Sequence, residues 1–187
     1  MARTPSNMIP LGTYVPEFNL PDTVSGKNFS SEELKGKISV VMFICNHCPF
    51  VKHVNDQLVN LSNDYISRGV KFVAISSNDV ANYPDDSPEK MKETAQLLRY
   101  PFPYLYDESQ TVAKSFDAAC TPDFYVFNEE GKLVYRGQLD DSRPSLDLPV
   151  TGKDLRAALD HTLAGKPVSE LQRPSIGCNI KWKVPQE

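Results

Sequence analysis

The sequence predicts an α/β fold in which a central mixed sheet is flanked by helices. Two apolar runs, 38–44 and 70–76, lack the alternation of a half-exposed strand, which is typical of strands buried on both faces. The segment between them repeats its apolar residues at helical spacing, and this order predicts a parallel pair with a right-handed crossover. Runs 124–127 and 132–136 are close enough to form an antiparallel hairpin. Parallel and antiparallel pairs together make the sheet mixed.

The N-terminal part of the chain predicts an arm that leads into the first buried strand. Residues 14–22 alternate apolar and polar side chains between prolines, which suits an edge strand or an extended arm. Residues 30–36 have the composition of one capped helical turn closed by glycine. Strand 38–44 follows directly, and we expect it at the centre of the sheet.

Two longer helices are predicted next. The first begins after Cys48 and ends at Arg68 and Gly69, because its apolar residues share one helical face: Val51, Val54, Leu58, Leu61 and Tyr65. The second begins at Ser87 and Pro88, which suit a cap and a first helical position, and runs to about Arg99. The polar, acidic segment 78–88 before the second helix is predicted to be a solvated surface loop.

The C-terminal half predicts shorter elements. A short strand is expected at 105–106 and a short helix at 109–116. The hairpin turns through 128–131, where glycine closes the turn. The last helix is expected over 154–164, with Thr151 as its cap.

These elements predict a single domain over residues 1–187. The length is that of one domain, and the chain shows no fixed-period repeat and no Gly/Ser linker. The core is expected at about 11–164. Residues 165–187 have no regular pattern and are predicted to form an irregular C-terminal extension.

Charge and hydropathy narrow the partners and the location. Acidic residues outnumber basic ones by 24 to 20, so we expect neither nucleic acid nor anionic lipid as a partner. The longest apolar run, 40–44, is far shorter than the roughly 20 residues that cross a bilayer, and the N-terminus lacks the apolar core of a secretory signal. We therefore expect no membrane association and a cytoplasmic location. In that reducing compartment the four cysteines are not expected to form structural disulfides.

Cys45 and Cys48 lie one helical turn apart, where the first buried strand gives way to a helix that Pro49 can begin. A disulfide with this spacing can open and close with little backbone motion. The amides at the start of the helix favour a thiolate, so we expect a lowered pKa and the attacking role for Cys45, with Cys48 as the resolving thiol. His47, when protonated, would stabilise the thiolate further and make the pair more oxidising.

The pattern resembles the thioredoxin superfamily and, more narrowly, the redoxins grouped as alkyl hydroperoxide reductase and thiol-specific antioxidant (AhpC/TSA) proteins. The resemblance covers about 11–164 and rests on segments 16–20, 36–43, 45–49, 73–76 and 120–127. It implies a thioredoxin-like fold and the activity of a thiol–disulfide oxidoreductase. The redox-active disulfide takes the place of a cofactor, and no other cofactor is implied. It also implies thioredoxin or glutathione as an electron donor, and a disulfide-bearing protein, a low-molecular-weight thiol or a peroxide as the substrate.

The resemblance further implies a substrate groove at Thr121 and Pro122. In the superfamily, a proline just before the penultimate hairpin is cis and packs against the two cysteines, and Pro122 takes that position. A cis bond there turns the backbone of Thr121 outward, so that it can pair with an extended substrate segment. We therefore expect this segment to bind a substrate peptide.

Two positions depart from the thioredoxin pattern. Thioredoxins carry Trp before the first cysteine and a buried Asp in the preceding strand, whereas this chain has Ile44 and, as the polar strand residue, Ser39. The internal proton acceptor is therefore not identified by the sequence.

A peroxiredoxin-like thiol peroxidase is the alternative function. Peroxiredoxins place Pro and Thr upstream of their reactive cysteine, and aligning that motif on Cys48 puts Val41 and Cys45 at those positions. Both signature residues are missing. A peroxide-polarising arginine would have to be one of three: Arg99, Arg136 or Arg143.

Two further cysteines are candidates for additional redox chemistry. Cys120 lies beside Pro122 and can be a third redox thiol, although a small buried apolar side chain is the favoured interpretation. Cys178 lies in the predicted extension, and the sequence favours a resolving role and an inert role for its thiol equally.

A copper- or zinc-binding protein of the same fold is the third possibility. Cys45, His47 and Cys48 supply soft ligands, but zinc ribbons repeat the CxxC motif and this chain does not. His53 and His161 are expected to face solvent or to be capped, so no metal site is assigned.

Overall fold

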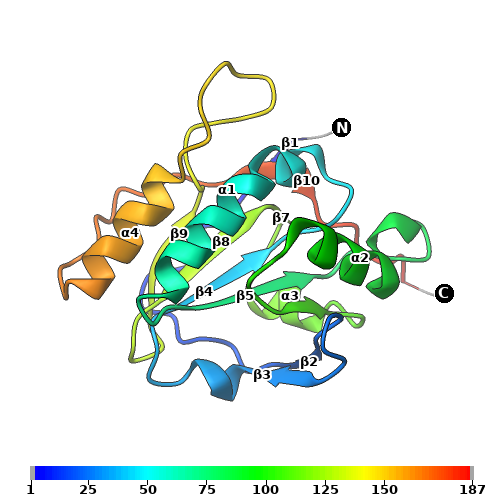
Figure 1. The fold of residues 1–187 in the computed structure, drawn as a ribbon, viewed down its shortest axis with the longest axis horizontal. Coiled ribbons are helices and arrows are strands. Elements are labelled where there is room, and N and C mark those ends of the chain that lie inside the picture. The colour runs from blue at the N-terminus through cyan, green and yellow to red at the C-terminus, as the bar shows by residue number, and fades with distance from the viewer. Residues whose placement is uncertain (1–2, 186–187) are drawn as a thin grey trace.

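The computed structural model describes residues 3–185; residues 1, 2, 186 and 187, at the ends of the expected domain, lie outside the described residues. Its centre is a five-stranded mixed sheet in the order β6–β5–β4–β8–β9 (Figure 1). The central strand β4 pairs in parallel with β5, as the sequence predicts, and antiparallel with β8. The strands are β4 (Ser39–Phe43), β5 (Lys71–Ser76), β6 (Tyr104–Tyr106), β8 (Asp123–Phe127) and β9 (Leu133–Gly137).

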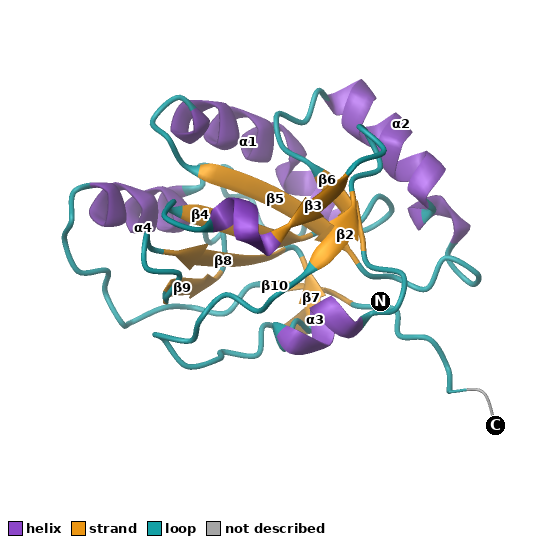
Figure 2. Cartoon of the chain, turned by 90° about the horizontal axis from the view of Figure 1, so that it is seen from below, coloured by secondary structure: helices purple, strands orange, loops and turns teal. Residues whose placement is uncertain are grey.

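Both faces of this sheet are covered (Figure 2). Alternate residues of β4 point to opposite faces: Val40 and Met42 belong to one apolar cluster, and Val41 and Phe43 to the other. This two-sided burial explains why β4 lacks polar alternation. One face packs against α1 (Pro49–Ile66), α2 (Pro88–Leu98) and α4 (Lys153–Leu163), and the other against α3 (Thr111–Ser115) and the 3₁₀ turn η1 (Ser31–Leu34).

The N-terminal arm contains a hairpin that the sequence shows only as an alternating segment. β2 (Asn19–Pro21) pairs with β3 (Asn28–Ser30), and the predicted capped turn follows as η1. Ser30 caps that turn through a reciprocal capping box with Glu33. The arm is attached to the edge of the sheet at β6, where the amide and hydroxyl of Thr23 donate to the Tyr104 carbonyl oxygen.

A second sheet joins the two ends of the chain and corrects the prediction of an irregular extension. β10 (Ile176–Asn179) lies between β1 (Arg3–Pro5) and β7 (Cys120–Thr121), antiparallel to both. The pairing is reinforced beside β10, where the Ser6 hydroxyl oxygen accepts the Ser175 amide at 2.8 Å and its hydroxyl donates to Asp123 at 2.8 Å. The β10 segment of the extension is therefore part of the core beside Cys120 and Thr121.

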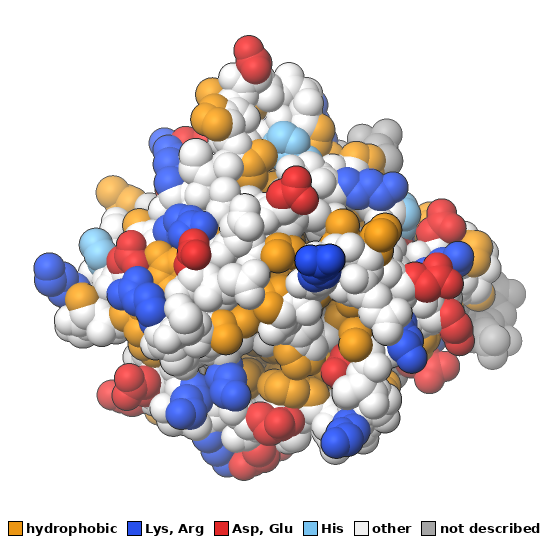
Figure 3. All heavy atoms as spheres, viewed as in Figure 1, with side chains coloured by type: hydrophobic (Ala, Val, Ile, Leu, Met, Phe, Trp, Pro, Cys, Tyr) orange, Lys and Arg blue, Asp and Glu red, His pale blue; other side chains and the backbone are white. Residues whose placement is uncertain are grey.

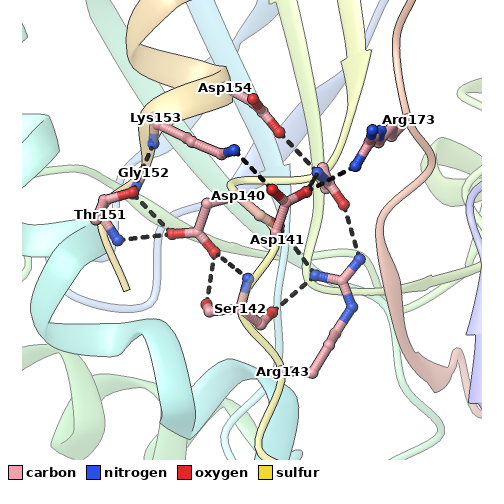
Figure 4. A network of polar contacts seen from close by, with 10 residues as sticks. Asp140, Asp141, Ser142, Arg143, Thr151, Gly152, Lys153, Asp154 and Arg173 are labelled. Atoms are coloured by element: carbon pink, nitrogen blue, oxygen red, sulfur yellow. Dashed lines mark hydrogen bonds and ion pairs between the residues drawn. The ribbon is translucent and has the colours of Figure 1, made fainter. Parts of the chain in front are cut away.

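The start of α4 differs from the expected Thr151 cap. Gly152 is the N-cap residue, with a φ of 70° that favours glycine, and a Cβ there would lie 2.9 Å from Leu61. The Asp140 carboxylate accepts the amides of Thr151 at 2.8 Å and Gly152 at 2.7 Å, and that of Ser142 at 2.9 Å (Figure 4). Asp140 therefore closes the long loop between β9 and α4 and orders the helix start.

The surface shows mixed charge. On the face drawn in Figure 3, basic and acidic side chains are interspersed, in keeping with the small net charge of −4. Within residues 3–185, every helix is too short or too polar to cross a bilayer.

Candidate active site: a buried thiol pair at the start of α1

Cys45 and Cys48 lie at the junction of β4 and α1. The chain leaves the sheet after Ile44, whose amide bonds to Ile75 of β5, and Cys48 is the N-cap residue of α1, with Pro49 in its first turn. Both cysteines are buried, with 2% and 0% of their surface exposed. The predicted placement of the motif between a buried strand and a helix is thus present.

Thr121 connects the two sulfurs. Its hydroxyl oxygen lies 3.5 Å from Cys45 Sγ, and its carbonyl oxygen lies 3.4 Å from Cys48 Sγ. The peptide bond between Thr121 and Pro122 is cis, as the resemblance implies. The expected open groove for a substrate peptide is absent, however, because the chain's own β10 pairs with this segment and Cys178 lies directly opposite Thr121.

The two thiols differ in acidity, in the opposite sense to the sequence prediction. A hydrogen bond from Cys45 is the largest cause that lowers the pKa of Cys48, to about 5, against the opposing effect of burial. Cys178 and the Val51 amide at the start of α1 lower it further. Hydrogen bonding to Cys48, burial and the Asp86 carboxylate raise the pKa of Cys45. Cys48 is therefore the more acidic thiol of the pair, because a hydrogen bond from Cys45 favours its thiolate while the Asp86 carboxylate opposes ionisation of Cys45.

Asp86 is the site residue that the sequence did not reveal. It ends the 3₁₀ turn η2 (Pro84–Asp86), is fully buried, and its carboxylate bonds to the ring nitrogen Nδ1 of His47. It also accepts the Asn46 amide at 2.8 Å and the Asn78 side-chain amide at 2.8 Å. The predicted solvated loop is thus wrong at Asp86. A run of acidic residues does not show which member turns inward.

The ion pair between His47 and Asp86 sets the charge beside the thiols. Its hydrogen bond raises the pKa of His47, against an opposing effect of burial. Burial of Asp86 works against its ionisation, yet hydrogen bonds from His47 and Asn78 hold its pKa below the ordinary value. The His47 ring also stacks on Tyr83, with centroids 5.6 Å apart, which fixes its orientation.

One group of potential metal ligands occurs among the described residues. Single donor atoms of Cys45, His47 and Asp86 lie within 4.8 Å of one another. Both Asp86 oxygens already accept hydrogen bonds, from the Asn46 and His47 amides and from the side chains of His47 and Asn78. The Asp86 carboxylate is therefore already hydrogen-bonded at both oxygens. This arrangement favours a role in setting the charge beside the thiols over binding of a metal ion.

The other two cysteines lie in different surroundings. Cys120 is fully buried, its sulfur lies 3.8 Å from the Pro122 carbonyl oxygen, and burial raises its pKa well above the ordinary value. Cys178 is 1% exposed and its thiol bonds to Cys48. Burial, followed by this hydrogen bond, raises the pKa of Cys178 to about 12. The structure thus brings Cys178, not Cys120, to the thiol pair.

Three arginines were candidates for polarising a peroxide. Two of them form hydrogen bonds with other groups, and the third ends a helix. Arg136 donates to the Ile9 carbonyl and the Gln172 side chain. Arg143 donates to the carbonyl oxygens of Asp140 and Ser142 and to the Gln138 side chain (Figure 4). Arg99 is the left-handed C-cap of α2. The hydrogen bonds of Arg136 and Arg143 are thus made to groups other than the site sulfurs.

The two remaining histidines follow different patterns. His161 is exposed, and its Nδ1 lies 3.2 Å from the Pro167 carbonyl oxygen, as expected for a surface histidine. His53 does not face solvent as predicted. Its Nε2 is buried and has no hydrogen-bond partner within the described part of the chain.

Comparison with known proteins identifies the family. The AhpC/TSA family model matches residues 11–136, which is more than half of the chain. The protein belongs to the AhpC/TSA family. Membership of this family places it among redox proteins. A comparison with functionally curated proteins gives no match.

Solved structures agree on the fold. A conserved protein of Geobacillus kaustophilus, described as uncharacterized, is 59% identical over 100% of this chain and 99% of its own, with a TM-score of 0.97. A hypothetical protein of Sinorhizobium meliloti is 46% identical over 97% of this chain and 100% of its own, with a TM-score of 0.95. A thiol:disulfide interchange protein of Chlorobium tepidum, 20% identical over 83% and 99% of the two chains, gives a TM-score of 0.62. The fold is thioredoxin-like.

Proposed function

We propose that this AhpC/TSA protein is a thiol–disulfide oxidoreductase that cycles between a Cys45/Cys48 dithiol and a Cys45–Cys48 disulfide. The observation that carries the proposal is the thiol pair itself. Both sulfurs lie at the start of α1 against the same residue, Thr121, and one of them has a pKa lowered to about 5. A stabilised thiolate with a second thiol beside it is the chemical requirement for disulfide exchange.

The reaction begins at the thiolate. Cys48 attacks one sulfur of a substrate disulfide, forming a mixed disulfide as the second substrate sulfur leaves as a thiolate. Cys45 then loses its proton and attacks the Cys48 sulfur, which forms the Cys45–Cys48 disulfide and releases the first substrate sulfur. Two electrons pass from the protein dithiol to the substrate. A donor dithiol reverses the sequence and restores the protein.

The His47 and Asp86 pair supports the first step. The Asp86 carboxylate lies within 4.8 Å of the Cys45 sulfur, where its charge keeps that thiol protonated, and its ion pair holds the His47 ring beside the two sulfurs. Protonated His47 stabilises the neighbouring thiolate by its charge, which favours the reduced pair and makes the disulfide more oxidising.

The partners follow from this chemistry. We propose low-molecular-weight disulfides and disulfide-bearing proteins as oxidants, thioredoxin or glutathione as the electron donor, and no cofactor besides the redox-active disulfide. The proposed setting is the cytoplasm, where such donors keep thiols reduced.

The test is a redox titration of the purified protein against defined ratios of reduced and oxidised glutathione, with each cysteine followed by thiol trapping and mass spectrometry. We expect one reversible Cys45–Cys48 disulfide. C45S and C48S should each lose catalytic turnover by more than about 100-fold, whereas the matched control C120S should keep it.

The alternatives give different results in the same set of variants. A thiol peroxidase would consume peroxide and form a sulfenic acid on Cys48, with Cys45 dispensable. A metal carrier would be isolated with stoichiometric metal and would lose it in either variant. Either outcome would overturn the proposed exchange activity.

A further inference from the structure

Strand register decides which of the two remaining cysteines reaches the thiol pair. In an antiparallel ladder, residues directly opposite each other point their side chains to the same face, and neighbours along a strand point to opposite faces. Cys178 of β10 lies opposite Thr121, and Asn179 lies opposite Cys120. Because the Thr121 side chain contacts the Cys45 sulfur, Cys178 lies on the face of the thiol pair and Cys120 points to the other face.

The contacts agree with this register. Both the thiol and the backbone of Cys178 hydrogen-bond to Cys48. The Cys178 sulfur also accepts a hydrogen bond from the Phe50 amide in the first turn of α1. On the opposite face, the Cys120 sulfur lies 3.8 Å from the Pro122 carbonyl oxygen. Three sulfurs therefore form one buried cluster, those of Cys45, Cys48 and Cys178.

Gly177 allows β10 to come this close. A Cβ at Gly177 would overlap the carbonyl group of Thr121, so any other residue would push β10 away from β7. Beyond the strand, the Lys181 amide donates to Asn78 at 2.9 Å, and Gln110 donates to the Lys181 carbonyl at 2.9 Å. Cys178 is therefore held at a fixed position between two anchored points.

β10 also occupies the place of a substrate peptide. The backbone edge of Thr121 is where an extended peptide could add as a strand, and β10 fills it with a cysteine opposite Thr121. Resting on the proposed exchange activity, we propose that Cys178 is an internal exchange partner of Cys48, able to resolve a disulfide on Cys48 and to carry it as a Cys48–Cys178 bridge.

The step balances within the chain. Starting from the Cys45–Cys48 disulfide, Cys178 gives up its proton and attacks the Cys48 sulfur. The Cys48–Cys178 bond forms as the Cys45–Cys48 bond breaks, and Cys45 leaves as a thiolate that takes up the proton. No oxidant is consumed, because one disulfide replaces another. The hydrogen bond to the Cys48 thiolate, which contributes to the raised pKa of Cys178, is lost once Cys48 is in a disulfide, and this makes Cys178 easier to ionise at that stage.

The experiment removes the competing thiol. C45S is treated with oxidised glutathione, which places a glutathione on Cys48, and the disulfides are mapped by mass spectrometry under thiol trapping. We expect Cys178 to displace the glutathione and to leave a Cys48–Cys178 bridge. In C45S/C178S the glutathione should remain, and its occupancy should rise at least about tenfold.

Two further variants test whether Cys178 must lie beside Thr121 and whether Cys120 can replace it. C45S/C120S should behave like C45S, because Cys120 faces away from the pair. C45S/G177V keeps the Cys178 thiol but forces β10 away from Thr121, so the glutathione should persist there as in C45S/C178S. Equal glutathione occupancy in C45S and C45S/C178S would overturn the inference.

This result can be told apart from a failure of the proposed function. If the wild-type protein forms no Cys45–Cys48 disulfide in glutathione buffers, the exchange activity itself is wrong. If it does form that disulfide but C45S makes no Cys48–Cys178 bridge, only the role of Cys178 fails.

Discussion

Cys48 and Cys120 lie on either side of the same short segment, Thr121–Pro122, and both are fully buried, yet their surroundings drive their acidities apart. The pKa of Cys48 is lowered to about 5, chiefly by the hydrogen bond from Cys45. The pKa of Cys120 is raised well above its ordinary value, first by burial and then by the charge of Asp123. Hydrogen-bond donors surround the Cys48 sulfur, whereas the Asp123 carboxylate lies near the Cys120 sulfur.

Two of the buried carboxylates, Asp86 and Asp123, show the same contrast. Asp86 is paired with His47 and hydrogen-bonded by Asn78, so its pKa stays below the ordinary value despite burial. For Asp123, burial outweighs the hydrogen bonds of Ser6 and Tyr125, and its pKa rises to about 7. Burial alone therefore does not decide the acidity of a group. The donors and charges around the group decide whether the effect of burial is outweighed, as it is at Asp86 but not at Asp123.

The largest expected effect concerns the location of the thiolate. At pH 7 the ultraviolet thiolate absorbance should correspond to one cysteine and disappear on acidification with a midpoint near the pKa of about 5 that Cys48 has. C48S should abolish this signal, because burial and Asp86 still raise the pKa of Cys45 in that variant.

The same measurement has two controls. C120S should leave the absorbance unchanged, since Cys120 stays protonated at pH 7, and C45S should retain most of it, because the serine hydroxyl can still donate to the Cys48 sulfur. Loss of the signal in C45S but not in C48S would place the thiolate on Cys45, as the position of the motif in the sequence suggests. That outcome would reverse the order of attack proposed above.

A smaller effect concerns the pH dependence of stability that comes from Asp123 of β8, the carboxylate near Cys120. The pKa of Asp123 is about 7 in the folded protein and near 3.9 in an unfolded chain, so between these values the folded state holds a proton that the unfolded state has lost. Stability from this group is thus complete below about pH 4 and is lost as the pH rises through about 7. From pH 5 to pH 8, the wild type should lose roughly 2–3 kcal/mol more unfolding free energy than D123N.

Denaturant unfolding at both pH values measures this difference. Comparing D123N with the wild type at each pH cancels the contributions of the groups they share. D147N, a change of an exposed aspartate in the loop before α4, should show the wild-type pH dependence. An identical pH dependence for D123N and the wild type would show that Asp123 is ionised throughout.

Sequence patterns were sufficient for elements defined by their own residues. The apolar run of β4, the helical face of α1 and the turn between β8 and β9 each carry a local signal, and all three form. β10 carries none, because it contains Gly177 and Cys178 and forms through pairing with β1 and β7, which are far away in the chain. Its pairing depends on the folded core.

The candidate site divides in the same way. The positions of Cys45, Cys48 and Pro122 follow from the motif and the family resemblance. The identity of the thiolate does not, because it depends on the approach of Asp86 from another loop and of Cys178 from the tail. Contacts between distant segments change the acidity of a group without leaving a pattern in the sequence.

The smallest expected effect concerns His47, whose charge acts on Cys48 from the surface side of the pair. The thiolate of Cys48 raises the pKa of His47, and by linkage protonated His47 stabilises that thiolate. H47Q should therefore raise the pKa of Cys48 by less than about 1 unit and make the disulfide more reducing by less than about 30 mV.

The pH dependence of this effect distinguishes charge from structure. The hydrogen bond to Asp86 raises the pKa of His47, so the stabilising charge is present in acid and is lost as the pH rises through that raised value. Midpoint potentials in glutathione buffers should differ between the wild type and H47Q at low pH and converge at high pH. H161Q, which changes an exposed histidine on α4, should follow the wild type throughout. A difference between H47Q and the wild type that does not vary with pH would mean that the ring positions its neighbours by packing on Tyr83, and that its charge does not tune the thiol pair.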